Sequence, residues 1–474
     1  MSCKDRGNAP QAAKPGPILA VMRRLILPLA LLVAVVLTAP ATRAAAKQYV
    51  APRGSGALFL ITGRGYGHGV GMGQWGAQGY ALHGFSYEDI LASYYPGTTL
   101  TQTTVRKIHV LLADGKKRVP ISSDKPYTVV DGNGKTDSVP AGSSSFGVES
   151  MTYPATFSAA TGSVLSLSGH AYRGKFVLSL VNGKLRVINL VSLQQYLYGN
   201  VPAEMPSSWL PDALDVQAVA SRSYALAGRK KGAAYDVLLT SQSYLGVAAE
   251  TAKGNAAVDA TKGQVLTYGG KVATTTYSSS TGGWTQSATD AWGGGAPYLV
   301  SVKDPYDSVS PWHKWGPVPV TGKTLRAALE LSAKPVDATV KRNGSKRVAQ
   351  LDVTTLAHGV RNHTTATGGT VAAAFSLRST WFSVGVLSLL APSPNVAVSP
   401  GTTVMLKGTV RGVKNVVLQQ RPVGGGAWTQ LKEVTPNPKT GAIGLNVTPD
   451  ATTDYRLETA AAAAAPIRIT VSQQ

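Results

Sequence analysis

Residues Val201–Leu226 read VPAEMPSSWLPDALDVQAVASRSYAL, and this stretch places one isolated carboxylate directly before a helix signal. Glu204 stands between Pro202 and Pro206. Each proline fixes its own φ and pushes the residue before it towards extended conformations, so we expect a stiff extended turn at Glu204. Such a turn presents a carboxylate in the way that a single general acid or base requires. The alternative is that Glu204 is a solvated or helix-capping residue.

A buried helix should follow the glutamate. Ser207 or Ser208 suits the N-cap and Pro211 suits the first turn, while Gly232 ends the pattern. Acidic side chains at the start and basic ones at the end fit the helix dipole. Mostly small residues recur at helical spacing and allow close packing: Ala213, Gln217, Ala220, Tyr224 and Ala227.

The composition indicates two or three domains and a polyanionic partner. The 474 residues contain 51 glycines and 28 prolines, which favour turns and β structure, and they carry a formal net charge of +22. A charge of this size predicts attraction to nucleic acid, anionic membranes or acidic cell-wall polymers. The charge is spread along the chain, and no zinc-finger or RNA-recognition signature occurs, so we expect no nucleic-acid partner.

The first residues have the layout of an export signal. Arg23 and Arg24 precede the apolar run 25–37, and small residues follow up to Ala46. We therefore expect a signal peptide over residues 1–46 and a secreted or cell-wall-associated protein without a stable membrane span after cleavage. An uncleaved anchor is the alternative. The one cysteine, Cys3, lies in this leader, so no disulfide or thiolate metal site is expected in the exported chain.

The patterning predicts an α+β fold, with antiparallel β structure around a central helix in a mixed catalytic domain and a small C-terminal all-β sandwich. Residues 47–104 are glycine-rich. The part before Ser86 contains too many glycines for a regular helix, and a short helix capped by Ser86 follows. Residues 105–190 alternate apolar and polar residues in short runs, which predicts antiparallel β structure. We also expect a short helix over residues 192–198 and a hairpin with Gly269 and Gly270 at its turn. The expected domains are 47–388, in which 191–388 carries the glutamate, and an immunoglobulin-like sandwich over 399–474, joined by a linker at 389–398.

Elimination leaves carboxylate chemistry. The histidines are scattered and no H-E-x-x-H occurs, so we expect no metal and no other cofactor. No G-x-S-x-G elbow is present. A glycosidase uses two carboxylates, and the possible partners of Glu204 are Asp212, Asp215, Asp236 and Asp290. The alternative is a single-carboxylate mechanism, in which Glu204 protonates the leaving oxygen and then takes a proton from an internal hydroxyl.

Several polar and aromatic residues are candidates for substrate binding, and for each one structural hydrogen bonding or core packing is the alternative. Trp284 and Trp292 can stack on sugar rings, and His68 lies in a glycine-rich surface loop. The candidates that can orient sugar hydroxyls or carboxylates are Arg222, Tyr224, Gln242, Tyr244, Ser279 and Tyr298.

The motifs resemble a known family. Besides the glutamate stretch, the chain contains GHGVGMGQWGAQGYA, TSQSYLGV, ATKGQVLTYGGKV and YSSSTGGWTQSATDAWGGGAPYL. Over residues 47–386 these resemble the family of stage II sporulation protein D, which includes peptidoglycan lytic transglycosylases and amidase enhancers. The resemblance implies a mixed α/β catalytic domain with Glu204 as the acid and base. It also implies cleavage of the β-1,4 bond after N-acetylmuramic acid without water, which leaves a 1,6-anhydro product.

The chain departs from that family in four respects. In the family the GHGVGM segment usually follows the rest of the domain. Here it comes first, as in a circularly rearranged form of the domain. The serine that usually follows this motif is Gly73, and acidic residues common before the glutamate are Gln194 and Gln195. The cysteines that bind zinc in some relatives are missing, in agreement with the absence of a predicted metal site.

Two functions of different classes follow. The first is an exported lytic transglycosylase acting on peptidoglycan glycan strands, with Arg222 and Tyr224 supporting the helix and the substrate. The second is a non-catalytic wall-binding protein that enhances an N-acetylmuramoyl-L-alanine amidase. A plain adhesion or spacer protein is a third alternative. The basic charge suits binding to anionic wall polymers in each case.

Overall fold

A computed structural model describes residues 48–230, 232–391 and 397–472. The predicted signal peptide, residues 1–46, lies outside the described residues. Helices account for about 19% and strands for about 40% of the described residues, and most neighbouring strands are antiparallel, which confirms the α+β class. The described residues belong to one unit. Within the described residues, no helix is both long enough and apolar enough to cross a bilayer.

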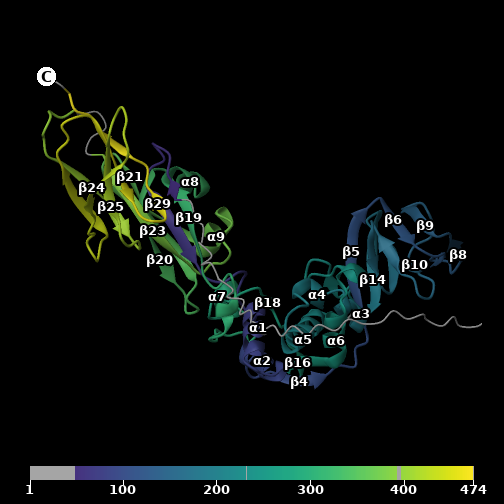
Figure 1. The fold of residues 1–474 in the computed structure, drawn as a ribbon. Coiled ribbons are helices and arrows are strands. Elements are labelled where there is room, and N and C mark those ends of the chain that lie inside the picture. Colours follow the sequence, from purple (N-terminus) through teal and green to yellow (C-terminus); the bar gives the residue numbers. More distant parts are fainter. Residues whose placement is uncertain (1–47, 231, 392–396, 473–474) are drawn as a thin grey trace, which may run out of the picture. The chain divides into compact units, whose positions relative to one another are not determined.

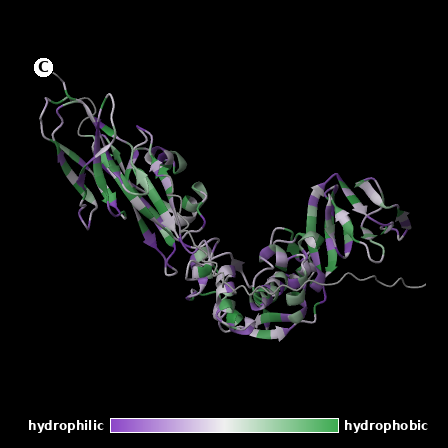
Figure 2. Ribbon diagram, viewed as in Figure 1, coloured by the Kyte–Doolittle hydropathy of each residue, from purple (hydrophilic) through white to green (hydrophobic). Residues whose placement is uncertain are grey.

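Residues 105–190 form antiparallel β structure, as the alternating pattern predicted (Figure 1). Buried residues alternate with exposed ones along many of these strands, which gives them an apolar face towards a shared core (Figure 2). One sheet has the order β15-β5-β14-β13-β10-β7-β8 and the strands β5 Lys107–Lys116, β7 Tyr127–Val130, β8 Thr136–Val139, β10 Ala155–Ser158, β13 Lys175–Val181, β14 Lys184–Ser192 and β15 Val237–Leu238. The second sheet has the order β12-β11-β6-β9 and the strands β6 Arg118–Ser123, β9 Gly142–Gly147, β11 Leu165–Leu167 and β12 His170–Tyr172.

The central helix is α5, Pro211–Ala227, and most of its residues are buried. It begins and ends differently from the prediction: Leu210, not Ser207 or Ser208, is the N-cap, and the helix ends before Gly228. Other elements surround α5 (Figure 1), and its small side chains allow them to pack closely. These neighbours include α2 Tyr87–Tyr94, α3 Leu193–Tyr198, α4 Val201–Glu204, α6 Ala252–Ala260 and the sheet β17-β16-β4, formed by Lys271–Val272, Gln264–Tyr268 and Thr99–Gln102. A 3₁₀ turn, η1 Gly246–Ala249, precedes α6.

The side-chain cap predicted at Ser86 is confirmed, and the short helix predicted to start at Ser192 has a side-chain cap as well. Ser86 accepts a hydrogen bond from Asp89 N at the start of α2, and Ser192 accepts one from Gln195 N at the start of α3. The hairpin at Gly269–Gly270 was also predicted correctly, because Tyr268 pairs with Lys271.

The expectation that the glycine-rich segment would not form a regular helix is wrong for its second half. Gln74–Leu82 forms α1, which packs on α5. Its glycines are needed for close approach: a Cβ on Gly76 would lie 2.1 Å from Tyr94 Oη, and one on Gly79 would lie 2.3 Å from Tyr306 O. The packing gained in this way offsets the low helix propensity of glycine.

The first strands of the described chain lie among the last ones. One sheet has the order β19-β2-β23-β24-β27, and another has the order β1-β29-β28-β25-β26, with β30 beside β28. Both sheets contribute to one apolar core, which includes Leu58, Leu387 and Tyr455. The strands are β1 Tyr49–Val50, β2 Leu58–Gly63, β19 Trp315–Thr321, β23 Phe382–Leu390, β24 Val404–Arg411, β25 Val417–Pro422, β26 Thr429–Glu433, β27 Ala442–Val447, β28 Thr453–Glu458, β29 Ala462–Ala463 and β30 Ile467–Ile469.

The predicted linker at 389–398 lies partly outside the described residues. Leu389 and Leu390 belong to strand β23 instead, where they pair with Gly408 and Lys407 of β24. The sheet therefore continues across the predicted start of the linker. The division into domains at 388 and 399 stays a prediction.

The remaining elements complete the part of the chain between the glutamate region and β23. The sheet β20-β21-β22 consists of Lys334–Arg342, Val348–Ala357 and Val360–Thr367. Two short strands, β3 Met72–Gly73 and β18 Tyr277–Ser278, pair in parallel. The helices are α7 Ala288–Trp292, η2 Asp307–Val309, α8 Gly322–Ala328 and α9 Gly368–Ala374.

Candidate functional site

Glu204 is the last residue of the short helix α4, and not part of an extended turn as predicted. Pro202 lies in the first turn of this helix, where a proline is compatible with helical geometry. Met205, which directly precedes Pro206, is the extended residue, with φ −126° and ψ 142°. The two prolines therefore fix a turn of helix followed by a sharp exit, and Glu204 stands at that exit.

The carboxylate of Glu204 is held by the loop that contains TSQSYLGV. Ser243 N donates to Glu204 Oε1 at 2.5 Å, and the side chain of Glu204 is half-buried. Asn200, which is fully buried, fixes the same loop by donating from Nδ2 to Ser243 O at 2.9 Å. Among the described residues, Oε2 of Glu204 has no hydrogen-bond partner, so one oxygen is anchored and the other is available.

A network of neutral polar side chains lies beside the glutamate. Tyr196 Oη donates to Gln242 Oε1 at 2.9 Å, and Gln242 Nε2 donates to Tyr277 Oη at 2.9 Å and to Ser221 O at 3.3 Å. Burial, and after it the charge of Glu204, raises the pKa of Tyr277 well above its usual value. These tyrosines therefore stay protonated at neutral pH and can act as hydrogen-bond donors.

The displaced glycine-rich segment adjoins the same region. Gln74, at the start of α1, donates from Nε2 to Glu204 O at 3.1 Å and lies 3.2 Å from Gln217 Oε1 of α5. The preceding strand β3 pairs with β18, which contains Tyr277. The GHGVGM motif thus lies beside the glutamate although it comes first in the chain.

Two tryptophans near the glutamate form an aromatic pair. The rings of Trp75 and Trp209 have centroids 4.7 Å apart, and both side chains are half-buried. Trp75 follows Gln74 in α1, and Trp209 follows Glu204 by five positions in the sequence. Trp75, Gln74 and Tyr277 were not predicted as site residues, although all three stand inside the GHGVGMGQWGAQGYA and YSSSTGGW motifs.

Two of the predicted substrate-binding residues are buried in structural contacts. Arg222 is fully buried and donates to Gln264 O and Val258 O, and burial lowers its pKa to about 10. Tyr244 is also buried and donates to Asn189 Oδ1 at 2.8 Å. Gln242 belongs to the network beside Glu204. Tyr224 is half-buried and lies edge-on to Tyr277, with ring centroids 6.5 Å apart.

The other predicted residues make no described hydrogen bond to Glu204. Ser279 O accepts from Trp75 N at 3.0 Å, and Tyr298 is buried with its hydroxyl 2.6 Å from Thr274 N. Lys346 Nζ lies 3.6 Å from the ring centroid of Trp284. His68 is exposed on one side and lies near the ring of Trp292, and desolvation by the surrounding protein lowers its pKa. The roles of these residues stay predictions.

Three of the four aspartates considered as partners of Glu204 make contacts elsewhere. Asp212 accepts from Tyr87 N, Asp236 is paired with Arg229, and Asp290 accepts from Ser345. Desolvation, together with Asp212 and Glu88, raises the pKa of Asp215 to about 7. Among the described residues, Glu204 is the one carboxylate whose charge helps to raise the pKa values of Tyr196 and Tyr277. The described contacts favour a single carboxylate at this site.

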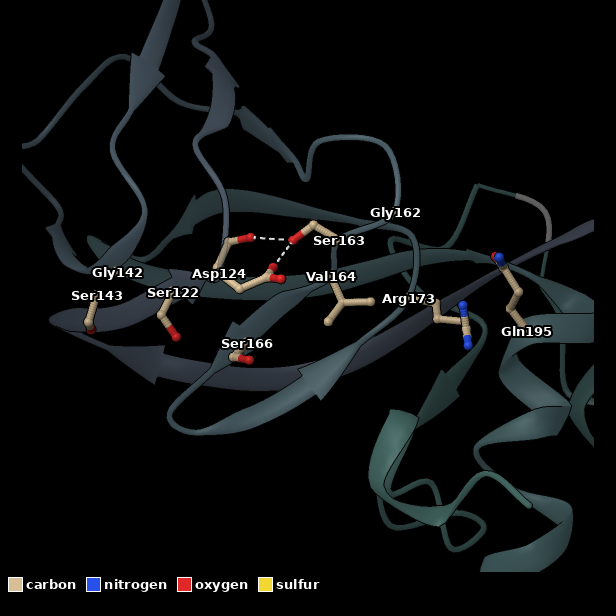
Figure 3. Close-up of a pocket in the computed structure, with 11 residues that line it drawn as sticks. Ser122, Asp124, Gly142, Ser143, Gly162, Ser163, Val164, Ser166, Arg173 and Gln195 are labelled. Atoms are coloured by element: carbon tan, nitrogen blue, oxygen red, sulfur yellow. Dashed lines mark hydrogen bonds between the residues drawn. The ribbon is translucent and has the colours of Figure 1, made fainter. Parts of the chain in front are cut away.

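A hollow of about 760 Å³ lies in the β structure of residues 122–173 (Figure 3). Serine hydroxyls, Asp124 and Arg173 line it, and Asp124 is hydrogen-bonded to Ser163. Arg173 is paired with Glu250 at 2.6 Å. Gln195 of α3 also lines this hollow, but none of the predicted site residues does.

Comparison with known proteins supports the predicted family. Residues 181–268 match the family model described as stage II sporulation protein. This part of the chain is similar to stage II sporulation protein D and to an amidase enhancer. The matched segment contains Glu204, the central helix α5 and strand β16.

Three relatives illustrate this similarity. The chain is 40% identical over 116 residues to the amidase enhancer of Bacillus subtilis (strain 168), covering 24% of this chain and 16% of the relative. It is 32% identical over 189 residues to stage II sporulation protein D of the same organism, covering 36% and 52%. It is 33% identical over 140 residues to stage II sporulation protein D of Bacillus amyloliquefaciens, covering 26% and 41%. The chain thus spans between about one sixth and one half of these relatives.

Proposed function

We propose that this protein is a peptidoglycan lytic transglycosylase in which Glu204 is both acid and base. The observation that carries the proposal is the state of the Glu204 carboxylate. It is half-buried, fixed through Oε1 by Ser243 N and unpartnered at Oε2 among the described residues. A carboxyl group held in this way has one oxygen for orientation and one for proton transfer.

The reaction needs no second carboxylate. Glu204 donates its proton to the glycosidic oxygen while the bond from that oxygen to C1 of N-acetylmuramic acid breaks. The C6 hydroxyl of the same sugar then bonds to C1, and its proton returns to Glu204. The products are a free hydroxyl end and a 1,6-anhydro end, and no water is consumed. The Ser243 N–H stabilises the carboxylate between the two transfers.

The surroundings of Glu204 suit a sugar chain. The half-buried Trp75 and Trp209 offer aromatic surface for a sugar face, and Tyr277 with Gln242 supplies neutral polar groups. The position of the GHGVGM segment next to Glu204 allows it to contribute to the same site despite its early place in the chain.

The test is the incubation of purified protein with glycan strands stripped of stem peptides, followed by mass spectrometry of the products. We expect 1,6-anhydro fragments from the wild type and a loss of about 10³-fold in rate for Glu204→Gln, because one general acid–base group contributes between about 10² and 10⁴. Glu433→Gln, an exposed carboxylate on β26, is the matched control and should keep the wild-type rate. Hydrolytic products with reducing ends would contradict the mechanism.

The similarity to the amidase enhancer supports a second candidate, a wall-binding protein that stimulates an N-acetylmuramoyl-L-alanine amidase. This candidate predicts that neither the wild type nor Glu204→Gln produces glycan fragments. It also predicts that an amidase releases stem peptides faster when the wild type is added. Stimulation that survives in Glu204→Gln, without anhydro products, would favour it over the enzyme.

A further inference from the structure

A second hollow, of about 360 Å³, combines basic and aromatic side chains. We call it the basic aromatic hollow, and its main lining residues are Thr62, Arg64, Lys314, Trp315, Trp381 and Ser383. It contains none of the residues that contact Glu204. Its volume lies in the range of pockets that hold small ligands.

The hollow is built at the ends of three adjacent strands. Gly63 of β2 lies between Trp315 of β19 and Phe382 of β23. A Cβ on Gly63 would lie 2.1 Å from the indole of Trp315, so only glycine lets this ring lie flat over the strand. Trp315 Nε1 donates to Gly65 O at 2.9 Å, which fixes the ring. The aromatic wall is therefore rigid before any ligand binds.

The cations of the hollow are not neutralised. Among the described residues, neither Arg64 nor Lys314 forms an ion pair with a carboxylate. Arg64 makes hydrogen bonds to Gly282 O at 3.3 Å and to the ring of His313 at 3.2 Å, and its guanidinium lies 5.6 Å from the centroid of Trp381. Lys314 is exposed. An anion entering the hollow would meet both cations at once.

A buried arginine adds to the positive field. Arg347 is fully buried with its guanidinium 5.1 Å from the centroid of Trp381, and its Nε and Nη1 have no hydrogen-bond partner. Burial lowers its pKa to about 10, so it stays charged at neutral pH. The nearby carboxylate of Asp307 already accepts from Ser280, Thr281 N, Gly282 N and His313.

A ligand that fits the hollow should contact both its tryptophan rings and its unpaired cations. A tryptophan ring packs on the apolar face of a sugar, whereas two unpaired cations recognise a carboxylate or a phosphate. Thr62 and Ser383 add exposed hydroxyls for hydrogen bonds to a sugar. We propose that the basic aromatic hollow binds one acidic sugar unit, bearing a carboxylate or a phosphate, of a polysaccharide. This site is separate from Glu204 and can hold the protein on a polymer that it does not cleave.

The test is titration of the full chain with three oligosaccharides, followed by tryptophan fluorescence and calorimetry. The probes are oligogalacturonate for carboxylates, a phosphomannan oligosaccharide for phosphates, and the N-acetylglucosamine tetramer as the neutral control. We expect an acidic probe to bind at least about tenfold more tightly than the neutral tetramer. Binding of one acidic probe alone identifies the charged group, and binding of both shows that either is accepted.

Variants locate the binding. Arg64→Ala/Lys314→Ala should weaken the acidic probe by about tenfold or more, and Trp381→Ala should weaken it and reduce the fluorescence change. The matched control Arg361→Ala/Lys407→Ala removes the same charge from exposed positions on β22 and β24 and should weaken binding by less than about threefold. Lys314→Ala alone, whose side chain makes no described hydrogen bond, serves if the double variant does not fold. Equal losses in both double variants, equal binding of the neutral tetramer, or preference for a short DNA oligomer would overturn the proposal.

Discussion

Asp304 is a buried carboxyl group whose protonation should control stability near neutral pH. Its exposed fraction is 1%, Thr281 Oγ1 donates to its Oδ2 at 2.7 Å, and its Oδ1 has no hydrogen-bond partner. Burial, and after it the charge of Asp307, raises its pKa from 3.8 to about 7. Between these two values the folded chain holds a proton at Asp304 that the unfolded chain has released. The free energy of unfolding therefore falls as pH rises through this window.

We predict that Asp304→Asn flattens this dependence. The amide keeps an oxygen for Thr281 but carries no charge at any pH, so the variant should lose less stability than wild type between pH 5 and pH 8, the working range of the test. Urea unfolding at several pH values measures the difference. Asp137→Asn, an exposed carboxylate on β8, is the control and should run parallel to the wild type. A variant curve as steep as the wild type would show that Asp304 is ionised throughout.

The sequence was enough to single out Glu204, but it did not show which side chains surround that residue. Glu204 could be singled out because two prolines limit the backbone around it, and its contact with Ser243 N is consistent with a defined position. Arg222 and Tyr244 were plausible sugar ligands by residue type, but both are buried in structural contacts. Residue type does not reveal which way a side chain points, and that depends on long-range packing that no local pattern encodes.

Among the elements, α1 depends most clearly on the absence of side chains. A Cβ on Gly76 would lie 2.1 Å from Tyr94 Oη and 2.4 Å from Asp304 Oδ2, so the helix must move away to accept it. A Cβ on Gly369, in helix α9, would meet only Thr367 Oγ1 at 3.7 Å, an ordinary contact. Alanine at Gly76 therefore tests the effect of crowding, whereas alanine at Gly369 tests the effect of helix propensity alone.

We predict that Gly76→Ala destabilises the protein by about 1–3 kcal/mol, as overpacking of a filled interior usually does. Gly369→Ala should be neutral or stabilise by up to about 1 kcal/mol, because alanine is the better helix former. Thermal unfolding of both variants checks the difference. Gly76→Ala should also slow glycan cleavage, since α1 carries Gln74, which is bonded to Glu204 O. Equal stability of the two variants would show that α1 can shift without cost.

The elements that the sequence predicted well have local signals. The helix after Ser86, the helix after Ser192 and the hairpin at Gly269–Gly270 each carry a cap or a turn in the chain itself. No such local signal marks α1, because Gly79 fits against Tyr306, which lies more than 200 residues away in the chain. Local propensity therefore favoured a loop where tertiary packing stabilises a helix.

For the whole molecule, the N-terminal strands are tied to the C-terminal ones. β1 pairs with β29, and β2 lies between β19 and β23, which in turn pairs with β24. Leu58 and Leu387 pack in the same core as Val410 and Tyr455. These contacts join residues on both sides of the domain boundary that the Pro- and Ser-rich segment near residue 391 suggested. A change in amino-acid composition can suggest a linker, but it does not show which strands pair.

We predict that deletion of residues 399–474 destabilises the remaining chain rather than releasing an independent domain. The deletion exposes the edge of β23 and uncovers Leu58 and Leu387, which are fully buried. We expect aggregation, or a Tm lower by about 10 °C or more, measured by calorimetry and light scattering. In the full chain, Leu387→Ala should cost about 2–5 kcal/mol, whereas Leu431→Ala, 38% exposed on β26, should cost far less. A soluble truncated chain with the wild-type Tm would instead establish residue 399 as a true domain boundary, because the core around Leu58 would then be stable without the strands that cover it.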